Sequence, residues 1–375
     1  MLLTKRAAFA AVCLANHFGP QGAIAQYTYE SKDEAGAVTA LSFLGGSEWL
    51  VAQEDPKSHW HRLPELTDVT LHNFPVSREA LRYVLSLKTL KGLVLGGDLE
   101  GIEIDTKVLE LLGKANHLEH LGLCFADMAD DHLQALPEMD KLESLEIGYF
   151  GDSGHKARFT DELAHLLVAT PKLRWIRIHS DDFTDEFVRI LSAKRDLESL
   201  EIHSPQLTDA SLALIGKLPA LRTLRIRAPL ITDEGVGHLR DLASLEELVI
   251  ESPNLGSGAL SLVSGLTRLT YLDLSIEAVG RGDLASVQNL QSLKIFALRK
   301  SPIGDEEFAA LRDHPSIETL FFERAHPTEN SLPVIESLKK LDYIHLSTKT
   351  EATRLLLDRI SKRGIRDGSF YPKPK

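Results

Sequence analysis

The stretch from Leu197 to Leu218, LESLEIHSPQLTDASLALIGKL, decides the fold of this chain. Its first six residues carry apolar side chains at the first, fourth and sixth positions, and their alternating end is typical of a half-buried strand. Pro205 then ends the strand, because proline has no N–H to donate to a neighbouring strand. Leu212 and Ile215 follow at helical spacing. Thr208 or Asp209 is placed to accept hydrogen bonds from the first helical turn, so the stretch predicts a strand, a turn and a short helix.

This stretch is one copy of a repeat that organises most of the chain. The pattern L-x-x-L-x-L, with Ile, Val or Phe allowed, begins at Leu66, Leu90, Leu118, Leu142, Leu173, Leu197, Leu221, Leu245, Leu269, Leu293, Ile317 and Leu341. Nine of the eleven spacings are 24 residues, and the other two are 28 and 31. One copy cannot bury both its strand leucines and its helix leucines, whereas stacked copies share one continuous apolar core. The strands are then expected to run parallel and to be joined by right-handed helical crossovers.

The repeat resembles that of the leucine-rich-repeat superfamily, in the short form found in exported bacterial proteins. The motifs that carry the resemblance are L-x-x-L-x-L and the recurring (L/I)-T-D-x-x-(L/V), and they cover residues 66–346. The resemblance implies an α/β solenoid, or horseshoe, with a concave parallel sheet and short helices on the convex side. The chain departs from the family at the turn after the strand, where Pro205, Pro229 and Pro253 stand in place of an asparagine ladder. This departure leaves the turn geometry open.

The ends of the chain predict a signal peptide and two caps. Residues 1–25 have a basic start, a short apolar run and an A-x-A cleavage site, which is the layout of a signal peptide. Residues 26–65 are less regular, with a weak repeat copy at 38–43, and are expected to cover the first open face of the core. Their aromatic and histidine side chains suited to this packing are Trp49, His59, Trp60 and His61. Residues 347–375 are expected to form a final cap helix, over 351–363, and a tail.

Composition excludes several classes of function. The 42 basic and 54 acidic residues leave a net charge of −12, which disfavours binding to nucleic acid or to an anionic membrane surface. No run of about 18 apolar residues is present, so membrane insertion is not expected. The two cysteines, Cys13 and Cys124, exclude a disulfide framework and a cysteine-rich zinc site. The chain has no G-x-S-x-G, H-E-x-x-H or phosphate-binding glycine motif, so we expect no enzymatic activity and no cofactor.

Function in such a solenoid is expected on the outward positions of the strands, the third, fifth and seventh of each repeat. The candidate partner-binding residues on the strands are Trp175, Arg177, His179, Glu201, His203, Arg225, Arg227, Glu251 and Tyr271. Aromatic and arginine side chains are enriched at binding hot spots, and Glu201 is expected to hold the guanidinium groups of Arg177 and Arg225. The alternative is an alternating charge ladder, beginning at Glu146, that serves solubility.

Two further features belong to the same prediction. The extra residues at 96–101 and at 148–155 interrupt the repeat on one rim, and the second insertion contains Tyr149 and Phe150, which we include among the partner-binding candidates. Neutral loop drift is the alternative. A metal site at His179 and His203 is disfavoured, because two histidines are few ligands and Arg227 would repel a cation.

The sequence therefore predicts a non-catalytic, monomeric scaffold that binds a protein or a cell-envelope partner through its concave face and rim loops. The alternative from another class is a structural spacer or surface-layer element without a specific ligand. A remote alternative is an enzyme that uses Cys124 as its nucleophile. The predicted location is outside the cytoplasm, secreted or periplasmic, and a cytoplasmic location is the alternative.

If the signal-peptide interpretation is right, the mature chain begins at or near Gln26. The intact mass of the protein recovered from its native host measures this directly. A mass that retains Met1 to Ala25 would contradict the interpretation.

Overall fold

The structure is a computed structural model of the 375-residue chain. It describes residues 27–32, 38–44, 66–72, 78–96, 106–124, 128–134, 136–148, 157–280, 282–347 and 350–367. The predicted signal peptide, the four aromatic and histidine residues of the predicted N-terminal cap, and the insertions at 97–101 and 149–155 lie outside these residues.

The chain divides into two compact units, which we describe separately. Unit 1 comprises Met1–Leu173 and Arg177–Ser180, and unit 2 comprises Arg174–Ile176 and Asp181–Lys375. The elements of unit 1 are β1 (Tyr27–Lys32), β2 (Val38–Leu44), β3 (Asp68–His72), α3 (Arg78–Ser86), β4 (Gly92–Gly96), α4 (Thr106–Gly113), β5 (His120–Cys124), η2 (Asp130–Leu133), η3 (Leu136–Glu138), β6 (Ser144–Ile147) and α5 (Leu163–Ala169). Strand β7 (Trp175–His179) is divided between the units.

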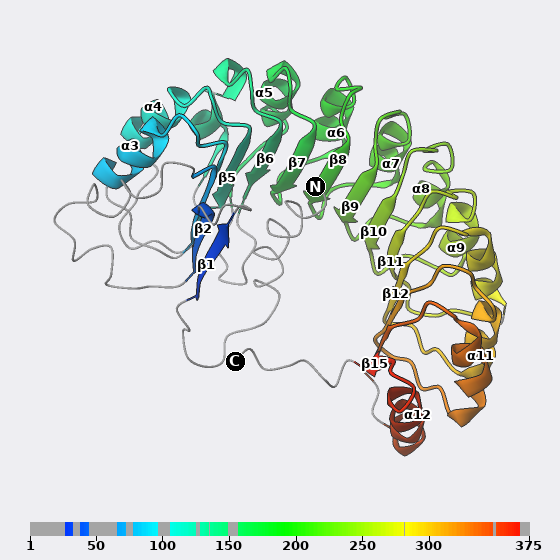
Figure 1. Ribbon diagram of the computed structural model, residues 1–375. Coiled ribbons are helices and arrows are strands. Elements are labelled where there is room, and N and C mark those ends of the chain that lie inside the picture. Colours follow the sequence, from blue (N-terminus) through cyan, green and yellow to red (C-terminus); the bar gives the residue numbers. More distant parts are fainter. Residues whose placement is uncertain are drawn as a thin grey trace. The chain divides into compact units, whose positions relative to one another are not determined.

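Unit 2 continues the alternation of strand and short helix (Figure 1). Its elements are α6 (Asp185–Leu191), β8 (Ser199–His203), α7 (Asp209–Ile215), β9 (Thr223–Arg227), α8 (Asp233–Gly237), β10 (Glu247–Glu251), α9 (Gly258–Val263), β11 (Tyr271–Ser275), η4 (Asp283–Asn289), β12 (Ile295–Arg299), α10 (Asp305–Phe308), η5 (Ala309–Leu311), β13 (Thr319–Phe322), η6 (Glu329–Ser331), α11 (Leu332–Ser337), β14 (Tyr343–Leu346), α12 (Glu351–Ser361) and β15 (Arg366–Asp367). Its helices from α6 to α11 lie on one side of its strands (Figure 1).

The strands have the predicted positions and, with one exception, the predicted direction. Among the described residues, each of the twelve repeat copies forms a strand that begins two residues after its first apolar residue. Strands β2 to β6 of unit 1 pair in parallel, and so do strands β8 to β15 of unit 2. The exception is β1, which pairs antiparallel with β2 as the outer strand of a hairpin. This short connection between the two strands allows only the antiparallel direction, since a parallel pair needs a crossover of a dozen or more residues.

The core consists of matching apolar positions from successive copies. Leu200, Leu224 and Leu248 lie opposite one another on β8, β9 and β10, and all three side chains are fully buried. Burial of one such leucine contributes about 1.5–3 kcal/mol, and each leucine packs against its equivalents in the neighbouring copies. The predicted register of these three leucines is confirmed.

Buried serines bridge successive copies at the turn where the family has asparagine. Ser204 Oγ donates to the Phe183 carbonyl at 2.7 Å, and Ser252 Oγ donates to the Ile231 carbonyl at 2.7 Å. In unit 1, Ser180 Oγ donates to the Phe159 carbonyl at the same distance. All three serines are buried, so each hydroxyl satisfies a carbonyl that has no access to water. Pro205 and Pro253 directly follow two of these serines, whereas Pro229 follows Ala228, which has no hydroxyl.

Aspartates at the helix starts form a second set of bonds between copies. Thr208 accepts a hydrogen bond from the Ala210 N–H as the N-cap of α7, as the sequence predicts. Asp209 does not cap its own helix. Its carboxylate accepts hydrogen bonds from the N–H and the hydroxyl of Thr232, the N-cap of the next helix, at 2.8 and 2.6 Å. We call Asp185, Asp209, Asp233 and Asp305, which all accept from the backbone N–H of the next copy, the aspartate ladder.

The aspartate ladder depends on small residues opposite the carboxylates. A Cβ atom at Gly235 would lie 2.2 Å from Asp209 Oδ1, so glycine at this position gives the carboxylate room. One helix without a Thr-Asp pair, η4, is a 3₁₀-helix that begins after Gly282, whose φ is 87°. Glycine adopts this left-handed conformation without the strain that a side chain would cause.

The last helix is close to its predicted position. The expected helix over 351–363 is observed as α12, with Thr350 as its N-cap and with Leu356 and Ile360 buried. Its role as a cap remains a prediction.

Replacing Leu224 with alanine is expected to lower the free energy of unfolding by about 2–5 kcal/mol, because the cavity lies between two other buried leucines. The damage is expected to stay local or to split unfolding into two transitions, since each copy contacts only its neighbours. Chemical denaturation measures both effects. Leu230→Ala is the control, because Leu230 is 49% exposed. A loss for Leu224→Ala as small as that of the control would contradict the core described above.

Asp185→Asn is expected to destabilise the protein by about 1 kcal/mol at pH 7, with a loss that shrinks in acid. Burial raises the pKa of Asp185, but hydrogen bonds from Ser211 and Thr208 outweigh it and hold the pKa below its usual value. Because the pKa is lower in the folded state, the stabilisation is present above the unfolded pKa of about 4 and is lost as the pH falls through the folded pKa. Denaturation from pH 7 to pH 3 tests this. Asp241→Asn is the control, because its carboxylate is 83% exposed and meets Arg240 only at 3.8 Å. A constant difference between wild type and Asp185→Asn over this range would contradict the interpretation.

Candidate binding surface on the strand face

The strands of unit 2 present one face opposite the helices, which we call the strand face. The alternation along β9 illustrates how the sequence builds it: Leu224 and Ile226 are buried, while Thr223, Arg225 and Arg227 are at least partly exposed. Since strands lie about 4.8 Å apart, equivalent positions of successive copies are close neighbours on this face. The strand face is therefore a set of columns whose side chains interact from strand to strand.

Arg225 lies in a cluster of charged and aromatic groups on β9, β10 and β11. Its guanidinium forms an ion pair with Glu247 and lies 5.5 Å from the centre of the Tyr271 ring, a cation–π geometry. Burial opposes the charge of Arg225, but the carboxylates of Glu247 and Glu201 outweigh it and raise its pKa. Burial, together with the nearby Asp273 carboxylate, raises the pKa of Tyr271 to about 12, so its hydroxyl stays protonated at neutral pH.

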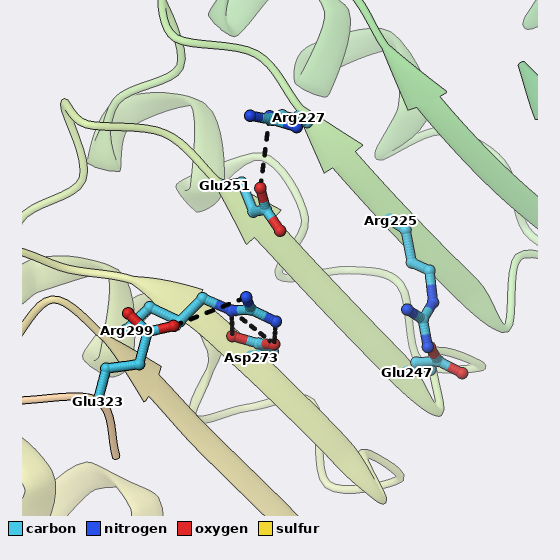
Figure 2. A network of polar contacts seen from close by, with 7 residues as sticks. All are labelled: Arg225, Arg227, Glu247, Glu251, Asp273, Arg299 and Glu323. Atoms are coloured by element: carbon cyan, nitrogen blue, oxygen red, sulfur yellow. Dashed lines mark hydrogen bonds and ion pairs between the residues drawn. The ribbon is translucent and has the colours of Figure 1, made fainter. Parts of the chain in front are cut away.

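Arg227 and Glu251 form a looser and more exposed pair at the end of β9 and β10. Arg227 Nε lies 3.5 Å from Glu251 Oε2, and the Arg227 side chain is the more exposed of the two (Figure 2). Exposed pairs of this kind contribute about 0–1 kcal/mol, so stability does not require it.

A third cluster joins Asp273 on β11, Arg299 on β12 and Glu323 after β13 (Figure 2). Arg299 Nε and Nη2 donate to the two oxygens of Asp273 at 3.0, 3.1 and 2.8 Å, a forked arrangement. The hydrogen bond to Asp273 raises the pKa of Arg299 further above its usual value. Glu323 is more distant, with its Oε1 3.8 Å from Arg299 Nη1.

The predicted site residues fall into three groups. Trp175, Glu201, His203, Arg225, Arg227, Glu251 and Tyr271 belong to unit 2, and all are at least partly exposed. Arg177 and His179 belong to unit 1, where Arg177 Nη1 donates to Glu146 at 2.9 Å. Tyr149 and Phe150 lie outside the described residues.

The structure adds detail to the contacts near Glu201 and changes one expectation about the outward positions. Arg225 forms an ion pair with Glu247 and Arg177 with Glu146, and Glu201 adds a favourable electrostatic interaction to Arg225. That Glu201 holds both guanidinium groups stays a prediction. Some positions expected to be outward and exposed are in fact buried; these are Cys124, Glu146, Val249, Asp273 and Ser275.

Sequence reasoning missed the part of the strand face on β12 to β14. Arg299 occupies the seventh position of its repeat, and Phe321 and His345 occupy fifth positions, so extending the same alternation would have found all three. Phe321 and His345 are stacked, with ring centres 4.3 Å apart and planes at 13°. No pattern in the sequence predicts that Asp273 is buried beneath Arg299 or that these two rings stack.

In the part of the chain that the structure describes, no group of three or more His, Cys, Asp or Glu side chains could hold a metal ion. His179 lies in unit 1 and His203 in unit 2. Among the same residues, no helix has the length and apolar character that crossing a bilayer requires.

The described residues define a leucine-rich-repeat fold, with parallel strands spaced mostly 24 residues apart and short helices between them. The resemblance predicted from the sequence is confirmed at the level of the fold. No protein-family model and no curated protein matches the chain. Among solved structures, the chain is similar to an internalin from Listeria monocytogenes, with 18% identity, a TM-score of 0.49, and coverage of 91% of this chain and 92% of that chain.

Proposed function

We propose that this protein is a non-catalytic scaffold that binds a protein or a cell-envelope partner through the strand face of unit 2. The observation that carries the proposal is the cluster of Arg225, Tyr271 and Glu247, in which an aromatic ring and a guanidinium are held in place at a partly exposed surface. Such side chains supply contact area and forked donors with little conformational entropy left to lose. Groups fixed before a partner arrives lower the entropic cost of binding.

The core does not need these residues. The apolar positions and the bridging serines and aspartates join the copies without help from the outward side chains. Trp175 is only partly exposed and lies on β7, in the same outward column as Tyr271. Large aromatic and arginine side chains at positions that the fold leaves unconstrained support a role in binding.

The structural spacer is the second candidate, and one observation favours it. At the beginning of the strands, Arg174 pairs with Glu198 at 3.2 Å, and Arg222 and Arg268 both contact Glu246. These exposed pairs link copies without any partner, as a solubility ladder would. They lie outside the outward columns, so the two candidates make different predictions for substitutions on the strand face.

Two parts of the proposal rest on the sequence, and a third rests on the burial of Cys124. A contribution of the rim loop around Tyr149 and Phe150, and of Arg177 and His179 in unit 1, remains a prediction. Export from the cytoplasm is proposed on the layout of residues 1–25. A non-catalytic role is favoured over a Cys124 nucleophile, because that side chain is 7% exposed and a nucleophile has to reach its substrate.

Trp175→Ala is expected to weaken partner binding by about 2 kcal/mol or more, with little effect on folding, as for a hot-spot residue. The mature protein serves as bait for pull-down and mass spectrometry, and calorimetric titration then compares wild type and variant with the captured partner. Charge reversals at Glu186 or Arg240, away from the strand face, are the controls and should leave the affinity unchanged. Equal affinity for Trp175→Ala and wild type would move the site, first to the loop with Tyr149 and Phe150. A partner whose binding no outward substitution weakens would favour the spacer.

A further inference from the structure

In three ion pairs of the strand face, the arginine is more exposed than its carboxylate; in a fourth, between Arg299 and Glu323, the carboxylate is the more exposed, at 37% against 31%. The exposed fractions of the arginine and carboxylate side chains are 38% and 25% for Arg225 and Glu247, 63% and 29% for Arg227 and Glu251, and 31% and 2% for Arg299 and Asp273. We call the three arginines the guanidinium row. The carboxylates Glu247, Glu251 and Asp273 are less exposed than the arginines that they contact. The groups that these pairs offer to a partner are therefore mainly the N–H donors of the arginines.

Arg299 shows most clearly that donors remain available. Asp273 engages its Nε and Nη2 atoms, while Nη1 makes no hydrogen bond to any described residue and lies 3.8 Å from Glu323. A guanidinium has five N–H donors, and the fork to Asp273 fixes its plane. The outward donors of Arg299 therefore have a defined direction before a partner binds.

Arg227 has more unbonded N–H donors than Arg299, but its guanidinium is held less firmly. Its guanidinium makes no hydrogen bond to a described side chain, and its contact with Glu251 is an ion pair at 3.5 Å. Arg227 lies on β9 and Arg299 on β12, so the two are three strand spacings, or about 14 Å, apart. This distance corresponds to roughly four residues of extended chain.

An aromatic surface adjoins the row at its β12 end. Phe321 lies opposite Ala297 on the neighbouring strand, two residues before the position of Arg299, and stacks on His345. Both rings are partly exposed. Apolar area beside a fixed guanidinium is the composition of a binding hot spot.

We propose that the guanidinium row and the Phe321–His345 stack bind a protein segment that presents two carboxylate side chains, about four residues apart, beside an apolar side chain. The inference rests on the proposed function and names the chemistry of its partner. Arginine is suited to this task because its planar fork matches a carboxylate in a bidentate pair.

A cationic partner fits this face less well. It would have to reach carboxylates that already contact a guanidinium, and Asp273 is almost fully buried beneath Arg299. The net charge of −12 repels an acidic partner mainly through distant carboxylates. This repulsion is weak, because charges separated by more than about 8 Å are screened at physiological salt. Recognition is therefore expected to depend on short-range hydrogen bonds and on apolar contact.

The experiment is a selection of random 12-residue peptides on the immobilised full-length protein, followed by titration of the selected peptides against variants. The proposal expects selected peptides enriched in Asp and Glu next to apolar residues. Arg299→Lys should weaken them about tenfold, because lysine keeps the charge but lacks the planar fork that Asp273 holds in place and that matches a partner carboxylate in a bidentate pair. Arg227→Ala should weaken them as well. Arg240→Ala, outside the strand face and 75% exposed, is the matched control and should have no effect.

Two further variants separate the proposal from its rivals. Asp273→Asn should weaken binding by loosening the direction of Arg299, whereas Glu323→Gln should leave it unchanged, because Glu323 makes no hydrogen bond to Arg299. Thermal melting of each variant confirms that it is folded.

Two outcomes would overturn the inference, and they are distinguishable. Peptides rich in Lys and Arg that are weakened by Glu323→Gln, and not by Arg299→Lys, would overturn the acidic partner and leave the proposed function in place. Failure to select any peptide that strand-face substitutions weaken would count against the inference and against the proposed function itself.

Discussion

The structure depends on one constraint: a single repeat copy cannot bury its own apolar side chains. Leu224 is fully buried only because Leu200 and Leu248 lie beside it on the neighbouring strands. This requirement makes the strands parallel and places the short helices on one side of each unit. It also aligns the outward residues in columns, so the packing of the core determines which polar side chains meet on the strand face.

Hydrogen bonds at the turns and helix starts make this stacking specific. Apolar contact alone would tolerate small displacements between copies, whereas the bonds of Ser204 and Asp209 to neighbouring copies hold for only one arrangement. A regular spacing between copies is what brings Arg299 within reach of Asp273. The structural bonds on the helix side and the candidate surface on the strand face are thus consequences of the same repeat.

One charge pair on the strand face, Arg299 with Asp273, differs from a solubility ladder in its depth. In a ladder, both members of a pair would be similarly solvated, as Arg222 and Glu246 nearly are. Asp273, in contrast, is buried beneath a partly exposed arginine, and a buried carboxylate needs the hydrogen bonds that Arg299 supplies. The result is a guanidinium with a fixed plane at the surface, which is of use to a binding protein and is not required by the core.

The sequence by itself determined the repeat, the start of each of the twelve strands, a helix N-cap at Thr208 or Asp209, and the alternation of strand positions. These features follow from periodicity and from local hydrogen bonding, which are properties of short segments. Only the tertiary structure decided that Asp209 accepts hydrogen bonds from the next copy, and that buried serines donate to carbonyls of the preceding copy at the turn. The pairing of Arg225 with Glu247 was likewise decided there. Such choices depend on which long side chain reaches which neighbour across about 4.8 Å between strands, and on how much water each loses. The amino-acid sequence alone specifies neither the reach of these side chains across the strands nor their loss of hydration.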